Sequence, residues 1–139
     1  IPNILVKGLR EAIKNSHATK IYVCNIVTQP GQTDGYTPSD HIRALIAHLG
    51  EDVLDYVLVN NCMPKKEVLE KYEHEGAKMV RLDPEAHNLF VKIIETDLIE
   101  DLETPRVLWE KQDLLRHDPD KLANAICRVY ARLPFFPVR

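Results

Sequence analysis

The densest group of polar residues able to bind a ligand lies in the loop VTQPGQTDGYT, residues 27–37, directly after an apolar segment. Its candidate groups are the backbone at Gly31 and Gly35 and the side chains of Thr28, Gln29, Thr33 and Thr37. Glycines let backbone N–H groups turn toward an anion, and a helix that begins at Thr37 would add its own N-terminal donors. Hydroxyl and amide groups complement sugar or phosphate oxygens. The loop is therefore a candidate site for an oxygen-rich ligand.

A structural role fits the same loop equally well. Pro30-Gly31 and Asp34-Gly35 are each typical of β-turns, and Thr37 could serve only as a helix cap. Neither the Walker A pattern nor the G-x-G-x-x-G dinucleotide pattern occurs in the sequence. Composition leaves both alternatives open, and a nucleotide site here would be of another type.

Further polar groups follow other apolar segments. Asn60 and Asn61 follow the run DYVLV, where their amides could contact a base, a ribose or a sugar, or simply turn the chain. Asp34, Asp40 and His41 could bind a divalent ion or move a proton, although Asp40 also fits a helix cap, which we favour.

The elements that must position these groups alternate between strand and helix patterns. The segments 20–26, 55–60 and 78–82 are short and apolar, as expected of buried strands. Helices are expected from Asn3 to about 15, from Pro38 to Leu49 and from 64 to 75. Successive βαβ units favour an α/β fold with a mainly parallel sheet.

The last third of the chain is less regular. Residues 89–95 and 107–115 are candidate strands of a smaller, antiparallel extension, and Asp118-Pro119 opens a final helix to about Leu133. We therefore expect one domain over 1–139, with βα units over about 1–88 and the extension with its helix over about 89–139.

Composition excludes several classes of protein. Among the 139 residues, 45% are hydrophobic and the net charge is −3, with no basic block that would bind nucleic acid. The three cysteines are far apart, which favours free thiols in the cytoplasm, and no apolar run is long enough to span a membrane. Because the chain opens on Ile1 rather than methionine, we expect it to start inside a larger protein.

Four segments carry a family resemblance: IPNILVKGLREAI, VCNIVTQPGQTDGYTPSDH, DYVLVNN and RHDPDKLANAI. Together they resemble the gluconeogenesis factor family, often called YvcK-type, which is related to the CofD-like 2-phospho-L-lactate transferases. The resemblance spans nearly the whole chain. It implies a Rossmann-like three-layer α/β fold, of which this chain would be the C-terminal half, without the glycine-rich N-terminal turn of the family.

The resemblance also implies a function. Members of the family bind UDP-sugars in the bacterial cytoplasm and act in gluconeogenic growth and cell shape, whereas the related transferases use a GDP-linked donor and magnesium. The loop residues matching the family motif are Thr28, Gln29, Pro30, Gly31, Thr33, Asp34 and Gly35. We expect these, with Asn60 and Asn61, to contact the ligand in a regulatory protein without catalytic residues. The alternatives are a magnesium-dependent transferase and an assembly module or homo-oligomer.

Overall fold

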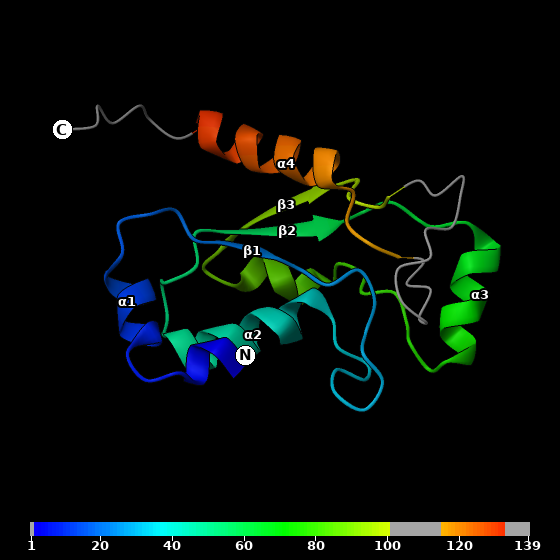
Figure 1. The fold of residues 1–139 in the computed structure, drawn as a ribbon, viewed down its shortest axis with the longest axis horizontal. Coiled ribbons are helices and arrows are strands. Elements are labelled where there is room, and N and C mark those ends of the chain that lie inside the picture. The colour runs from blue at the N-terminus through cyan, green and yellow to red at the C-terminus, as the bar shows by residue number, and fades with distance from the viewer. Residues whose placement is uncertain (1, 101–114, 133–139) are drawn as a thin grey trace.

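The computed structural model describes residues 2–100 and 115–132 of the chain (Figure 1). Its elements, in order, are η1 (Pro2–Leu5), α1 (Leu9–Asn15), β1 (Ile21–Val23), α2 (Pro38–Leu49), β2 (Tyr56–Asn60), α3 (Lys66–His74), η2 (Pro84–Asn88), β3 (Lys92–Thr96) and α4 (Pro119–Arg132).

The strands form one parallel sheet in the order β1-β2-β3. In its register, Tyr56 of β2 lies beside Ile21 on one side and Lys92 on the other. The central strand is buried over its whole length because it is paired on both sides and covered on both faces. The expected α/β fold with a parallel sheet is confirmed.

Two apolar layers enclose β2, since successive side chains of a strand point to opposite faces. Val57 and Val59 pack with Ile42 of α2. Tyr56 and Leu58 pack with Ala125 and Val129 of α4. Figure 1 shows α4 above the sheet and α2 below it, so the described chain has the three layers expected of a Rossmann-like domain.

The third strand of the sheet is not the one that the sequence pattern suggested. Residues 78–82 stay outside the sheet: Val80 donates to the Ile26 carbonyl, and Met79 forms an isolated antiparallel bridge with Val27. The third strand is instead β3, which we expected in a separate antiparallel extension and which pairs in parallel with β2. Both segments are short and apolar, so only their distant partners distinguish them.

The N-terminal helix is also shorter than expected. Gly8 adopts φ +85 and separates the short 3₁₀ turn η1 from α1, whereas the sequence pattern suggested one helix from Asn3. Neither η1 nor α1 contains a buried residue.

Other boundaries agree with the predictions. Helix α2 begins and ends where its cap signals placed it, with Gly50 after its end, and α3 is a little shorter than predicted. Helix α4 begins at Pro119 as predicted. The candidate strand at 107–115 lies outside the described residues except for Leu115. None of the helices in the described ranges is both long and apolar enough to cross a membrane.

Candidate functional site

The candidate site lies at the carboxyl edge of the sheet, where all three strands end. The loop 24–37 leaves β1 there, Asn60 ends β2 and Thr96 ends β3; in Figure 1 this is the edge toward which the strand arrows point. In open parallel sheets this edge is the usual place for ligands.

The loop holds its own shape through two side chains. The hydroxyl of Thr33 accepts a hydrogen bond from the Gln29 N–H at 2.8 Å, and the Asp34 carboxylate accepts one from the Gly31 N–H at 2.8 Å. The Gln29 carbonyl accepts from the N–H groups of Gln32 and Thr33. These bonds fix the loop before any ligand binds, which lowers the entropy cost of binding.

Both glycines of the loop adopt conformations that other residues avoid. Gly31 has φ +76 and Gly35 has φ +72. No atom would crowd an added Cβ at either position, so the backbone conformation, rather than close packing, requires glycine there.

Thr28 attaches the base of the loop to the segment that follows α3. Its side chain is buried, its N–H donates to the Lys78 carbonyl at 2.8 Å, and its hydroxyl accepts from the Lys78 N–H at 2.9 Å. Pro30 lies beside Gly76, where an added Cβ would approach the proline ring at 3.9 Å. Thr28 therefore serves the scaffold of the loop.

The loop residues open to a ligand are a subset of those suggested by the sequence. Gln29, Pro30, Gly31, Asp34 and Gly35 are exposed, and Thr33 is half-buried. The exposed residues contain one carboxylate and no cation, so an anionic ligand would need its counter-charge from another part of the edge.

The start of α2 already has two carboxylates bound to it. Asp40 accepts hydrogen bonds from the Thr37 N–H and hydroxyl, at 2.9 and 3.0 Å. Asp83 accepts from the Ser39 N–H and, through its other oxygen, from the Ala86 N–H in η2. The expectation that this helix start holds a ligand anion is wrong for this structure, because protein carboxylates occupy the donors.

Asp83 thus joins the N-terminal ends of α2 and η2. Burial alone would raise its pKa, but hydrogen bonds from Ser39, Thr37 and Ala86 outweigh that effect and hold the pKa below the ordinary value. We did not expect this role, since nothing in the local sequence links Asp83 to a helix start 44 residues earlier.

The two asparagines at the end of β2 differ sharply in their surroundings. Asn60 is buried; its Oδ1 accepts from the N–H groups of Cys62 and Leu98, and its Nδ2 donates to the Cys62 carbonyl at 2.7 Å. Asn61 is exposed, with its N–H bound to the Thr96 carbonyl. Only the Asn61 side chain is thus open to a ligand without breaking the scaffold.

A segment that we did not count as part of the site, residues 115–118, crosses the carboxyl edge. His117 donates from Nε2 to the Cys24 carbonyl at 3.2 Å, and the Arg116 carbonyl accepts from the Glu100 N–H. The Leu115 N–H donates to the Tyr72 hydroxyl of α3. The segment therefore brings the half-buried Arg116 to the ends of the strands, and its RHDP pattern was the signal available in the sequence.

An ion pair fixes the start of α4 to the end of β3. The Lys121 ammonium lies 2.7 Å from both the Asp97 carboxylate and the Ile99 carbonyl. The hydrogen bond from Lys121 lowers the pKa of Asp97, and the same bond raises the pKa of Lys121. Asp97 therefore neutralises this lysine, which serves the scaffold rather than a ligand.

His41 lies behind the loop, with its ring edge-to-face against Tyr36 at 5.2 Å between centroids. Its side chain is buried, and among the described residues no group forms a hydrogen bond with Nε2. Burial lowers its pKa, against the opposing effect of Asp40. The neutral ring is therefore the form that the folded protein favours.

The structure was also searched for a reactive cysteine and for a metal site. Burial raises the pKa of the Cys24 thiol to about 11, so the thiol stays protonated and is a poor nucleophile or zinc ligand. Within the described ranges no three His, Cys, Asp or Glu side chains are grouped as a metal site. Asp34 and Asp40, two of the candidate ligands of a divalent ion, each accept a hydrogen bond from a backbone N–H group.

Known proteins resemble this chain in sequence and structure. It is 44% identical over 129 residues to a Thermotoga maritima protein, covering 93% of this chain and 39% of that protein. It is 41% identical over 126 residues to the gluconeogenesis factor of Halalkalibacterium halodurans, covering 91% of this chain and 37% of that protein. It therefore spans less than two fifths of either relative.

The fold has a counterpart among solved structures. A UPF0052-family protein from Bacillus halodurans superposes with a TM-score of 0.78 at 39% identity, covering 91% of this chain and 38% of that chain. The model of the 2-phospho-L-lactate transferase CofD family matches residues 1–99, which include the loop and all three strands. The chain belongs to the CofD family.

Proposed function

We propose that this chain is the ligand-binding part of a bacterial cytoplasmic regulatory protein that binds a UDP-sugar and acts in gluconeogenic growth and cell-shape control. The relatives named gluconeogenesis factor support the gluconeogenic role. The single observation that carries the binding proposal is the preformed, exposed loop at the carboxyl edge of the parallel sheet, held by Thr33 and Asp34.

The residues proposed to contact the ligand are those of the carboxyl edge that are exposed. The exposed amide of Gln29 and the exposed backbone at Gly35 offer donors to sugar or phosphate oxygens, whereas the Gly31 N–H is already bound to Asp34. Asn61 offers an amide from the neighbouring strand end.

Isothermal titration of the full-length protein containing this chain tests the proposal. Saturable binding of UDP-N-acetylglucosamine, with no binding of GDP plus magnesium, is the expected result. No binding of either uridine or guanosine ligand would overturn it.

Variants then locate the site. Gln29→Ala and Asn61→Ala should each weaken binding by about threefold to thirtyfold, the usual range for one hydrogen bond to a ligand, without lowering stability. Asp34→Ala should weaken binding further because it releases the Gly31 N–H that shapes the loop. Thr28→Ala is a poorer probe, since it also removes a buried scaffold bond to Lys78.

The alternative is a magnesium-dependent transferase with a GDP-linked donor, supported by the name of the family. Magnesium is commonly held by one or two carboxylates together with substrate phosphates, and the exposed Asp34 could supply one of these carboxylates. Asp34→Asn separates the two functions: it keeps an acceptor for Gly31 and should preserve UDP-sugar binding, whereas loss of a magnesium-dependent transfer reaction would favour the transferase.

A further inference from the structure

Arg81 is a cation of the carboxyl edge whose donors are largely unused in the described ranges. Its side chain is exposed and forms no ion pair with any carboxylate of those ranges. Its guanidinium donates to the Met63 sulfur at 3.5 Å, and a thioether is a weak acceptor. Most N–H donors of Arg81 are therefore open to a ligand.

Backbone contacts place Arg81 between the loop and the end of β2. Segment 78–82 lies beside the base of the loop, since the Val80 N–H donates to the Ile26 carbonyl at 2.9 Å. The contact with Met63 fixes the Arg81 side chain against the stretch that follows β2. Strands β1 and β2 are neighbours, and the carboxyl ends of neighbouring parallel strands are where open α/β sheets bind ligands.

Two other cations near this edge are already paired. Arg43 lies 2.6 Å from Glu85, and Lys121 lies 2.7 Å from Asp97. Each carboxylate neutralises its cation and occupies donors that a ligand would need. Arg81 differs from both, because its charge and its donors are not committed to a carboxylate in the part of the chain that the structure describes.

The acid closest to Arg81 along the chain does not pair with it. Asp83 uses its two carboxylate oxygens to accept hydrogen bonds from the N–H groups of Ser39 and Ala86. Arg81 therefore keeps its positive charge at an edge where the loop, residues 27–37, contains no lysine or arginine of its own.

Two exposed lysines add positive charge on the same segments. Lys78 lies beside Thr28 at the base of the loop, and Lys65 follows Met63 by two residues at the start of α3. Neither forms an ion pair with another described residue. The surface around Arg81 is therefore basic, which favours a negatively charged ligand.

From these observations we infer that Arg81 binds the diphosphate of the nucleotide ligand, an inference that rests on the proposed function. Phosphate oxygens carry the negative charge of such a ligand, and the planar guanidinium donates paired hydrogen bonds that match their geometry. The exposed amides of Gln29, in the loop, and Asn61, after β2, are then left for the sugar and the nucleoside.

Arg81 is a clean probe because it contributes little to the fold. Its one hydrogen-bond partner among the described residues, Met63, is itself 49% exposed. Arg81→Ala should therefore shift the melting temperature by no more than about 2 °C.

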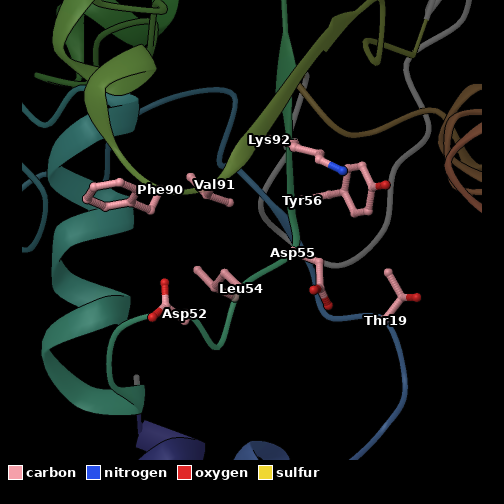
Figure 2. A pocket seen from close by; sticks show the side chains of 8 residues that line it. All are labelled: Thr19, Asp52, Leu54, Asp55, Tyr56, Phe90, Val91 and Lys92. Carbon is pink, nitrogen blue, oxygen red and sulfur yellow. The ribbon is translucent and has the colours of Figure 1, made fainter. Parts of the chain in front are cut away.

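Lys92, at the amino edge of the sheet, provides a matched control. It is exposed, and its ammonium lies 5.4 Å from the centroid of the Tyr56 ring, at the start of β2 (Figure 2). The candidate site lies at the other end of the strands. Lys92→Ala therefore changes the net charge of the protein as much as Arg81→Ala does, without touching the site.

Isothermal titration of the full-length protein with UDP-N-acetylglucosamine and, separately, with inorganic pyrophosphate tests the inference. Arg81→Ala should weaken the binding of both by about tenfold or more, the usual effect of losing hydrogen bonds to a charged group. Arg81→Lys keeps the charge but not the paired donors, so its affinity should fall between those of the wild type and Arg81→Ala. Lys92→Ala should bind both ligands like the wild type.

Equal affinity of the wild type and Arg81→Ala for UDP-N-acetylglucosamine would overturn the inference and leave the proposed function intact. An equal loss in Lys92→Ala would also overturn it, because only the net charge of the protein would then matter. Absence of UDP-N-acetylglucosamine binding in the wild type would overturn the proposed function instead. Pyrophosphate binding weakened by Arg81→Ala would in that case still assign phosphate recognition to Arg81, and unchanged pyrophosphate binding would exclude it.

Discussion

The two edges of the sheet use their polar side chains in opposite ways. At the carboxyl edge, Asn60 and Thr28 are buried and bound to the backbone of segments distant in sequence. At the amino edge, Glu51, Asp52 and Lys92 are exposed and have no ionic partners in the described ranges. In the described residues, the polar side chains of the first edge form a scaffold and those of the second are exposed.

The contrast shows where a polar residue can be replaced without loss of structure. A buried amide that loses a partner leaves another buried group unpaired, whereas an exposed charge is solvated by water. At the carboxyl edge, function can therefore be tested only with its exposed members, such as Gln29 and Asn61.

The largest effect is expected at Asn60. Asn60→Ala removes three hydrogen bonds and leaves the Leu98 N–H buried without its acceptor, so the free energy of unfolding should fall by about 2–3 kcal/mol. Urea denaturation measures it. Asn61→Ala, one residue later and exposed, is the control, with an expected change within about 0.5 kcal/mol. Equal losses in both variants would remove the distinction between scaffold and exposed positions.

A smaller loss is expected at Asp83. Asp83→Ala removes the shared acceptor of two helix starts and should cost about 1–2 kcal/mol at neutral pH. Because the folded pKa of Asp83 is lowered, its stabilisation is present above the unfolded value of about 3.8 and is lost as pH falls through the folded pKa. The difference between wild type and variant should shrink in acid; a pH-independent difference would contradict this account.

The smallest effect should come from two histidines, the buried His41 and the half-buried His117. Burial lowers the pKa of His41 and of His117 below 6.5, so the unfolded state binds protons first and stability should fall as pH drops below 6.5. His41→Phe keeps a ring against Tyr36 and removes the unpaired nitrogen; its stability at pH 8 should differ by less than about 1 kcal/mol.

The dependence of the free energy of unfolding on pH separates the contributions of His41 and His117. Between pH 5 and 8 the His41→Phe variant should lose the contribution of His41 and keep that of His117. An unchanged profile between pH 5 and 8 would show that His41 does not titrate on unfolding.

Local sequence signals predicted one part of the fold well. The Thr37-Pro38 start and Gly50 end of α2 were readable because caps act within a few residues. Strand β2 was readable because its run is apolar and bounded. The choice between residues 78–82 and β3 as the third strand was not, since it depends on pairing with β2 rather than on either segment alone.

The candidate site was likewise predictable from the sequence only in part. Its loop was visible as a cluster of glycine, hydroxyl and amide groups. Which of them serve the scaffold was not, because the partners are distant: the Thr28 hydroxyl binds Lys78, 50 residues away, and Asn60 binds Leu98, 38 residues away. The segment 115–118 was missed because only the fold brings it to the strand ends.

Hydrogen–deuterium exchange of the full-length protein, with and without UDP-N-acetylglucosamine, tests the central claim most directly. We expect the ligand to slow exchange at residues 29–36 and 61–62 of the carboxyl edge, and to leave residues 88–92 of the amino edge unchanged. Slowed exchange at 88–92, with none in the loop, would place the ligand at the other edge of the sheet and contradict the account.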